Sequence, residues 1–295
     1  MEIKVAAIIV TYNRLGLLKE CVQSLRDQTY KKLSIIVVNN GSTDGTTEWL
    51  DMQRDILKIH QANVGGAGGF FTGIKYACEH GYEYSWIMDD DVVANCTALE
   101  ALINSTNGIK GFLCSRVLDM NGEQCNVPKI STAKSNSTGE LLWGELLNIH
   151  LLRVDITSFV SVLIRNSVVY ELGLPYKEYF IWGDDTEFTS RISKFYSSYM
   201  VIDSVVVHKR NQQGVLSLFT ETNKKRIDNF FYSYRNRIHY QRTFLTKILV
   251  FLYSLSESAR LLFRGKCRAS YVILCGLVKS ITFRPQIQYP QRCLN

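Results

Sequence analysis

Proline is scarce in this sequence, with only 4 prolines among 295 residues. Its 19 glycines are dispersed, and no segment repeats. Long flexible linkers are rich in proline, glycine or serine, so this composition excludes one. A chain of this length, 46% of it hydrophobic, forms either one large domain with an appendage or two modest domains.

Paired cysteines are also missing, because none of the 8 cysteines belongs to a C-x-x-C pair. Zinc sites and dithiol redox sites usually contain such a pair. The sequence leaves no room for a signal peptide either, since a strand is predicted directly after Met1 and Glu2. We therefore expect a cytoplasmic chain whose cysteines are small core residues and not disulfide partners.

The chain has no uninterrupted apolar run of about 18 residues, the length that a helix needs to span a bilayer. Residues 235–284 nevertheless combine ten Lys or Arg residues against a lone Glu257, which exceeds the +7 of the whole chain. They also hold an apolar helical face, made of Leu245, Ile248, Leu249, Leu252, Leu255, Ala259 and Leu262. A second apolar stretch, 271–281, is interrupted by Gly276 and Lys279. A basic amphipathic segment favours an anionic membrane surface over nucleic acid. Packing on the rest of the chain, or on a second copy in a homo-oligomer, is the alternative.

Strands and helices alternate through the first 105 residues. Apolar runs predict strands at 5–10, 33–38, 56–60 and 84–88, and later at 111–118, 154–164 and 199–207. Helical spacing predicts helices at 14–28, 46–54, 66–80 and 97–105, one from about 186 to 195, and one from 223 almost to 264. This alternation is typical of a Rossmann-like, mostly parallel sheet with helices on both faces.

Polar segments follow each of the first four predicted strands, at 11–14, 39–44, 61–63 and 89–91. Ligands of open α/β sheets bind beyond the carboxyl ends of the strands. The four polar segments therefore predict one site on one rim of the sheet.

Asp89, Asp90 and Asp91 end the fourth strand. Three adjacent carboxylates repel one another unless a positive charge lies among them. Side chains at positions i and i+2 suit a hard divalent cation, Mn²⁺ or Mg²⁺, which also binds phosphate oxygens. The alternative is a solvated acidic turn that caps the helix beginning near Thr97.

A glycine-rich turn, 63–69, opens the third helix. Bare backbone at a helix N-terminus suits a phosphate or a sugar, although a tight loop without a ligand has the same pattern. Asn40 and Asp44 have the groups to read a pyrimidine edge, and Tyr12 has a ring to stack on it. Each of these residue types is also common in turns and helix caps.

Taken together, these segments resemble glycosyltransferase family 2, whose members have the GT-A fold. The resemblance covers about residues 3–240. Its motifs are Ile8-Ile9-Val10-Thr11-Tyr12-Asn13-Arg14, Val37-Val38-Asn39-Asn40-Gly41-Ser42-Thr43-Asp44-Gly45-Thr46, Asn63-Val64-Gly65-Gly66, Asp89-Asp90-Asp91 and Gly183-Asp184-Asp185-Thr186-Glu187.

Within the family the chain most resembles bacterial galactofuranosyltransferases, and next the rhamnosyltransferases. This narrower resemblance rests on the triple Asp, on Trp182 to Glu187, on His208 and on Tyr234-Arg235-Asn236-Arg237. Many relatives carry an Asp where this chain has Asn39 and Asn40, yet an amide can still accept from the base N3–H. Uracil and thymine share that edge, so UDP-linked and dTDP-linked donors are not separated by it.

The resemblance implies a metal-dependent, inverting transfer of a sugar. It assigns Asp89, Asp91 and His208 to Mn²⁺ or Mg²⁺, and Asp185 to the catalytic base, with Asp184 orienting the acceptor. It places the donor against Thr11, Tyr12, Asn13, Arg14, Asn40, Asp44, Asn63, Gly66 and Asp90. Tyr179, Trp182 and Glu187, beside the base, are candidates for acceptor binding. The alternative for Asp184 and Asp185 is that they only cap the helix from Thr186.

The sequence thus predicts a GT-A catalytic domain, 1–240, and a basic amphipathic helical extension, 241–295. The expected donor is UDP-galactofuranose, with dTDP-rhamnose as the alternative. The expected acceptor is a polyprenyl-linked glycan of a bacterial surface polysaccharide, such as O-antigen or capsule, at the inner face of the cytoplasmic membrane. A sugar nucleotidyltransferase usually needs a basic residue in the glycine-rich turn, and 63–69 contains none. A non-catalytic sugar-binding module would not need both acidic groups.

Overall fold

The structure, a computed structural model, describes residues 3–209 and 217–292. Within that part of the chain, one ten-stranded sheet has the order β3-β2-β1-β4-β9-β6-β10-β8-β7, with β5 against β10. The strands are β1 (Val5–Thr11), β2 (Leu33–Asn39), β3 (Ile56–His60), β4 (Tyr84–Asp89), β5 (Val92–Ala94), β6 (Leu113–Leu118), β7 (Lys129–Ile130), β8 (Leu151–Ile156), β9 (Val162–Arg165) and β10 (Ser198–His208). The first four are parallel to their neighbours in the order β3-β2-β1-β4, as the sequence predicts.

Both faces of the sheet are buried, as the continuous apolar run of β1 indicates. Alternate residues of that strand enter different cores: Val5, Ala7 and Ile9 face one cluster, and Ala6 and Ile8 face the other. The first cluster is covered by α1 (Leu15–Arg26), α2 (Thr46–Met52) and α4 (Ala98–Asn104). The second is covered by α3 (Gly65–Glu79), α5 (Asn166–Leu172) and α6 (Asp184–Ser193). Helices on both faces, around a mostly parallel half-sheet, were expected.

The single strand expected at 154–164 is wrong. Its residues form β8 and β9, which lie at different places in the sheet, β8 beside β10 and β9 between β4 and β6. The chain leaves the sheet after β8 because Thr157 turns toward α6, where its N–H donates to the Thr189 hydroxyl. Both strands are antiparallel to their neighbours.

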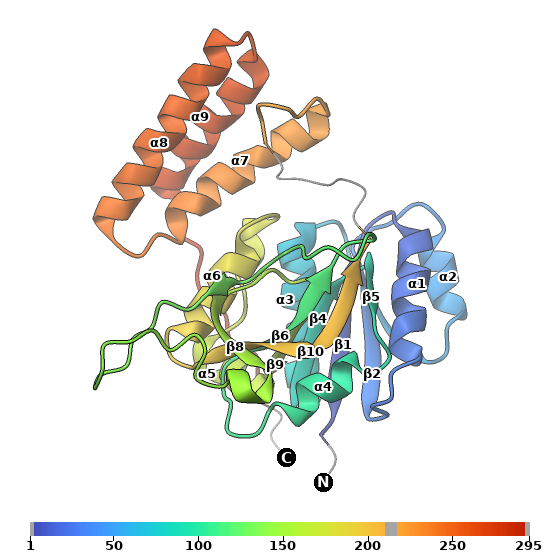
Figure 1. The fold of residues 1–295 in the computed structure, drawn as a ribbon. Coiled ribbons are helices and arrows are strands. Elements are labelled where there is room, and N and C mark those ends of the chain that lie inside the picture. Colours follow the sequence, from blue (N-terminus) through green and yellow to red (C-terminus); the bar gives the residue numbers. More distant parts are fainter. Residues whose placement is uncertain (1–2, 210–216, 293–295) are drawn as a thin grey trace.

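The long helix expected from 223 is also divided. It forms α7 (Lys224–His239) and α8 (Phe244–Phe263), and α9 (Cys267–Thr282) follows. The break comes at Thr243, which caps α8 by a reciprocal capping box with Thr246. In Figure 1 the three helices lie together beyond the sheet, on the side of the α6 N-terminus. They share a core of their own, so α7, which we expected in the catalytic domain, packs with the extension.

The extension exposes much of its apolar surface. The predicted apolar face of α8 points to solvent, with Leu245 65% and Leu249 56% exposed, while its serine-bearing side packs inward through Ser254 and Ser258. In the described residues, 3–209 and 217–292, no helix has the length and the apolar character that spanning a membrane requires.

The expectation that the cysteines are core residues is only partly met. Cys21, Cys78, Cys114 and Cys125 are buried, whereas Cys96 and Cys267 are exposed and Cys275 is intermediate. Cys293 lies outside the described residues.

Candidate active site

The polar segments after the first four strands meet at one rim of the sheet. Thr11, at the end of β1, donates its hydroxyl to Asp90, 2.8 Å away, after β4. Asn40, after β2, donates to Asn63 after β3 at 3.3 Å. These bonds join segments that are distant in sequence, so the rim predicted from the polar strand ends exists.

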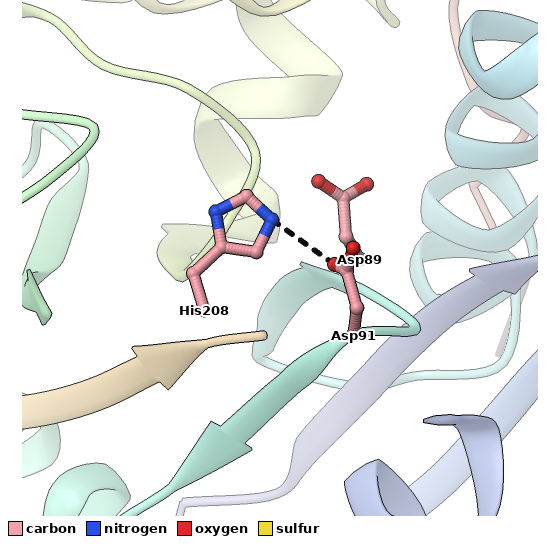
Figure 2. A group of neighbouring side chains, drawn as sticks. All are labelled: Asp89, Asp91 and His208. Carbon is pink, nitrogen blue, oxygen red and sulfur yellow. Dashed lines mark ion pairs between the residues drawn. The ribbon is translucent and has the colours of Figure 1, made fainter. Parts of the chain in front are cut away.

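Asp89, Asp91 and His208 form a compact group on this rim. Each offers one ligand atom, and these atoms all lie within 4.8 Å of one another. His208 ends β10, which pairs with β5 directly after the acidic turn, and this pairing brings the imidazole to the carboxylates. Figure 2 shows the three side chains pointing toward one another, with His208 Nε2 3.1 Å from Asp91 Oδ1.

The group fits a divalent cation on two observations. Asp91 Oδ1 is buried and, among the described residues, accepts no hydrogen bond, so it has an open coordination position. Burial, followed by repulsion from Asp91 and Asp90, raises the pKa of Asp89 well above its ordinary value. A cation at this position would bind the free Asp91 Oδ1 and would offset the repulsion among the three carboxylates. Two carboxylates with one imidazole suit Mn²⁺ better than Mg²⁺, which prefers oxygen ligands.

Arg14 supplies the positive charge that these carboxylates contact in the structure. Its Nη1 lies 3.2 Å from Asp90 Oδ1 and 2.9 Å from Asp91 Oδ2. Burial raises the pKa of Asp90 to about 6 even though Arg14 and Thr11 oppose the shift.

Asp184 and Asp185 begin α6, where the helix dipole favours negative charge. Asp184 is buried, and burial followed by repulsion from Asp185 raises its pKa to about 8. Asp185 is only partly buried, and its Oδ1 accepts from the Thr186 N–H at 2.6 Å. Its charge also contributes to the raised pKa of Asp89, so the acidic pair and the metal-ligand group belong to one site.

The segment before this pair is held by two residues of α7, Arg235 and Asn236, which belong to a motif that the resemblance noted without assigning a role to either. Phe180, Trp182 and Gly183 all have positive φ, which is unfavourable for the two aromatic residues. Asn236 is fully buried and donates to the carbonyls of Tyr179 and Trp182 at 3.0 and 2.8 Å.

Arg235 completes this attachment, because its guanidinium donates to the carbonyls of Glu178 and Tyr179, at the end of the short helix η2 (Lys177–Tyr179). The guanidinium also lies 3.8 Å from the ring centre of Phe283. The resemblance had drawn attention to the motif around Arg235, but no local pattern shows that its side chain reaches a carbonyl 56 residues earlier.

The candidate residues for binding the sugar nucleotide lie on the rim, but several of them make hydrogen bonds within the rim itself. Asn40 is buried, and its amide contacts Gln61, Asn63, Val64 and Gly65.

Asp44 accepts from Leu15 and Thr46, and Asn13 accepts from Thr43. These are the turn and cap contacts that we weighed as alternatives. Tyr12 remains 47% exposed and available for stacking.

The glycine-rich turn serves mainly close packing. A Cβ on Gly65 would lie 2.0 Å from the Phe180 carbonyl oxygen, and one on Gly69 would lie 2.3 Å from Val10 Cγ1. Gly66 differs, because a Cβ there would meet nothing within 4 Å. Within 63–69, Gly66 therefore fits the expected open approach to a donor, and Gly65 and Gly69 do not.

The expected acceptor residues need correction. Tyr179 is 0% exposed, and its hydroxyl lies 2.6 Å from His239 Nδ1, so its side chain cannot contact an acceptor in this structure. Glu187 pairs with Arg191 at 2.9 Å and is largely buried. Trp182 is partly buried and packs on Phe230 of α7. Aromatic residues near an acidic pair suggested a platform, whereas in the structure tertiary packing occupies most of their surface.

Comparison with known proteins shows that the first part of the chain is similar to a known family. Residues 6–123 match the model of the family described as Glycosyl transferase family 2. The matched segment contains Asp89 and Asp91, and it ends before Asp184 and His208.

Three curated proteins illustrate the sequence similarity. Galactofuranosyltransferase GlfT1 of Mycolicibacterium smegmatis is 26% identical over 203 residues, 64% of this chain and 65% of GlfT1. Glycosyltransferase GlyA of Streptococcus pneumoniae is 39% identical over 76 residues, 24% of this chain and 11% of GlyA. The uncharacterized glycosyltransferase YibD of Escherichia coli is 25% identical over 214 residues, 65% of this chain and 58% of YibD. The chain thus spans less than two thirds of the length of each of these relatives.

Solved structures share the fold. TarS 1-349 of S. aureus in complex with UDP-GlcNAc superimposes with a TM-score of 0.59 at 16% identity, over 95% of this chain and 81% of that one. GalNAc-T7 with UDP, GalNAc and Mn²⁺ superimposes with a TM-score of 0.58 at 14% identity, over 83% of this chain and 53% of that one. The GT-A fold expected from the sequence is thereby confirmed.

Proposed function

We propose, from the membership of residues 6–123 in glycosyltransferase family 2, that the protein is a metal-dependent, inverting glycosyltransferase. The observation that carries the proposal is the meeting of two acidic groups on one rim. Asp89, Asp91 and His208 form a group suited to a divalent cation. Asp184 and Asp185 lie near enough for the charge of Asp185 to influence Asp89. A metal group and a carboxylate base in one site are what sugar transfer from a nucleotide requires.

The residues have distinct roles in this reaction. When bound, a divalent cation neutralises charge that develops on the departing diphosphate. Asp89, Asp91 and His208 would hold it, while Tyr12 and Gly66 would contact the base and the phosphates of a donor. Asp185, the less buried of the pair, accepts the proton of the attacking hydroxyl, while burial raises the pKa of Asp184 to about 8 so that it holds a proton at neutral pH. The protonated Asp184 donates a hydrogen bond that orients the acceptor. Attack opposite the leaving group inverts the anomeric centre.

The proposed donor is UDP-galactofuranose. Similarity to galactofuranosyltransferase GlfT1 supports the sugar, and the two structural neighbours were solved with UDP-GlcNAc and with UDP. A dTDP-rhamnose donor is the alternative within the family.

The proposed acceptor is a polyprenyl-linked glycan presented at the cytoplasmic side of a bacterial membrane. Support comes from the extension, where Phe244, Leu252 and Phe263 are 80%, 55% and 92% exposed. Exposed apolar residues flanked by Lys247, Arg260 and Arg264 have the composition of an interfacial helix. The protein would thus attach peripherally, with its site held near the lipid-linked sugar.

A donor screen tests the function. The full chain is incubated with Mn²⁺, a polyprenyl-linked acceptor and, in turn, UDP-galactofuranose, UDP-galactopyranose, UDP-GlcNAc and dTDP-rhamnose, with the Asp185→Asn variant as the matched control. Transfer from UDP-galactofuranose by the wild type alone is the expected result. Transfer from dTDP-rhamnose alone would move the protein to the alternative. Release of pyrophosphate from a nucleoside triphosphate and a sugar 1-phosphate, without sugar transfer, would overturn the proposal.

A further inference from the structure

We propose that Asn126 is a positioning residue that fixes which nitrogen of His208 faces Asp91, and so sets the affinity of the site for a divalent cation. The inference deepens the proposed function and rests on its assignment of His208. Asn126 lies in the turn-rich segment after β6, and neither the sequence nor the family match, which ends at residue 123, draws attention to it.

The geometry around the imidazole supports this role. Asn126 Oδ1 lies 2.9 Å from His208 Nδ1, while His208 Nε2 faces Asp91 Oδ1 at 3.1 Å. The Asn126 amide is oriented by Ser158, whose hydroxyl oxygen accepts from Asn126 Nδ2 at 3.2 Å. An amide oxygen only accepts, so Nδ1 must carry the proton and donate it. Nε2 is then the nitrogen left for a metal, on the same side as the carboxylates.

The backbone also holds Asn126 in place. Its φ is +47°, a left-handed conformation that Asn adopts more readily than most residues. The preceding residue, Cys125, is buried and donates its N–H to the Val117 carbonyl at 3.0 Å, which ties the loop to β6. The amide therefore reaches His208 from a fixed position and not from a freely moving loop.

The same contact connects the metal-ligand group to the acidic pair. Ser158 follows Thr157, whose N–H donates to the Thr189 hydroxyl of α6 at 3.2 Å. That hydroxyl in turn donates to the carbonyl oxygen of Asp185 at 2.7 Å. Asn126 thus joins His208 to the segment that also supports the base, so its loss should loosen the imidazole relative to both carboxylate groups.

The test measures Mn²⁺ binding to the full chain by electron paramagnetic resonance of free Mn²⁺, with and without UDP. Asn126→Gly removes the amide while allowing the positive φ, and it should weaken Mn²⁺ binding about 10- to 100-fold. Asn126→Asp keeps an oxygen acceptor and should stay within about threefold of the wild type. Asn121→Gly, in the same loop and exposed, is the matched control and should bind as the wild type.

The His208→Ala variant distinguishes a failure of the positioning role of Asn126 from a failure of the assignment of His208. If it loses Mn²⁺ and Asn126→Gly does not, the positioning role is wrong and the proposed function stands. If His208→Ala binds Mn²⁺ as the wild type does, the assignment of His208 fails, and the inference fails with it. Equal losses in Asn126→Gly and Asn126→Asp would show a purely structural role and overturn the inference. Ser158→Ala, which leaves residue 126 intact, should weaken binding measurably, and unchanged affinity in that variant would also count against it.

Discussion

At the scale of single residues, Asp184 and Asp185 are neighbours in sequence that differ in environment. Asp184 is 7% exposed, whereas Asp185 is only partly buried. Two buried carboxylates that repel one another share one proton, and the more buried of them holds it. This division supports the proposal that Asp185 is the base and that Asp184 is a hydrogen-bond donor.

Asp185→Asn should therefore abolish catalysis while the protein still binds the donor. We expect kcat to fall about 10²- to 10⁴-fold, while the UDP affinity, measured by calorimetry, changes little. Asp184→Asn should lose less activity, because an amide also donates a hydrogen bond. Burial raises the pKa of Asp185 above its ordinary value, so activity should decline as pH falls through that raised pKa. Near-normal turnover by Asp185→Asn would transfer the role of base to Asp184.

Asp184 should also make stability depend on pH. Its pKa is about 8 in the folded protein and 3.8 in an unfolded chain, so between these values the folded state holds a proton that the unfolded chain has lost. The proton stabilises the fold fully at low pH, and this stabilisation is lost as pH rises toward 8.

Asp184→Asn should thus raise the free energy of unfolding more at pH 8 than at pH 5, by more than about 1 kcal/mol. Urea unfolding at the two pH values measures it, with the exposed Asp27→Asn as control. An equal effect of Asp184→Asn at both pH values would contradict the raised pKa.

The residues that could be found from sequence are those that lie in motifs. Asp89, Asp91 and the Asp184–Asp185 pair occur in short patterns, and the family resemblance supplied His208. Asn126 could not be found, because it acts on a partner 82 residues away in sequence and has no charge or pattern that marks it. Asn236 lies in a motif that the resemblance noted, but nothing in that motif shows that its side chain reaches the carbonyls of Tyr179 and Trp182. Tyr179 was misassigned because proximity to the acidic pair in sequence does not indicate which way a ring points.

At the scale of elements, two glycines at the start of α3 have different roles. Gly69 lets the helix approach β1, so Gly69→Ala should lower the free energy of unfolding by about 1–3 kcal/mol through the clash with Val10. Gly66→Ala meets open space and should leave stability unchanged or slightly higher. If the turn approaches donor phosphates, Gly66→Ala should instead weaken UDP binding. Thermal unfolding and UDP titration of both variants measure this, and unchanged UDP affinity in Gly66→Ala would remove the turn from the donor site.

The contact of α7 with the segment before α6 gives a further prediction. Asn236→Ala removes the side-chain donor to the Trp182 carbonyl and one of the donors to the Tyr179 carbonyl, and it should destabilise the protein by about 2–3 kcal/mol. Because the same carbonyls precede Asp184, kcat should fall more than UDP affinity does. Gln241→Ala, which removes one bond at the end of α7, is the control and should change stability by less than about 0.5 kcal/mol. A loss of stability with kcat unchanged would show that the contact does not position the acidic pair.

The sequence predicted most helices and strands, but two of the predicted elements are each divided in the structure. The spacing of apolar residues predicts the helices and strands of the first 105 residues, because the apolar residues of each element face a core at regular intervals. The run 154–164 gave no sign of a division, because apolar residues occur on both sides of Thr157, although β8 ends at Ile156 and β9 begins at Val162 in another part of the sheet. The division after α7 depends on the Thr243 cap, which is a local signal that the long helical pattern obscured.

At the scale of the whole molecule, the exposed face of α8 should attach the protein to anionic membranes. Removing residues after 241 would uncover buried core residues of α7 such as Phe230 and Tyr234, so point variants of the full chain are the sharper test. The double variant Leu249→Glu, Leu252→Glu should abolish flotation with anionic liposomes, because it places charges on a surface that must enter the interface. Wild-type flotation should weaken at high salt and with neutral lipid.

The matched control places the same charges elsewhere. Met52 and Leu57 are exposed apolar residues outside the extension, at 70% and 40%, and Met52→Glu with Leu57→Glu should float as the wild type does. Equal flotation of both double variants would mean that α8 is not the attachment surface. A loss of flotation accompanied by a change from a larger to a smaller species in sedimentation would instead identify the face as a contact between copies of the chain.

Helix α7 contacts both the segment before the proposed base and the helices that we expect to bind the membrane. One side of it carries Asn236 to the segment before Asp184, and another side packs against α9, in the same core as α8. Should lipid contact favour the arrangement of α7 that also favours donor binding, reciprocity requires equal factors in both directions. A vesicle surface that raises donor affinity tenfold would itself be bound tenfold more tightly by the donor-loaded enzyme. The concentration of sugar nucleotide would then govern how much enzyme resides on the membrane, and not only how fast it turns over there.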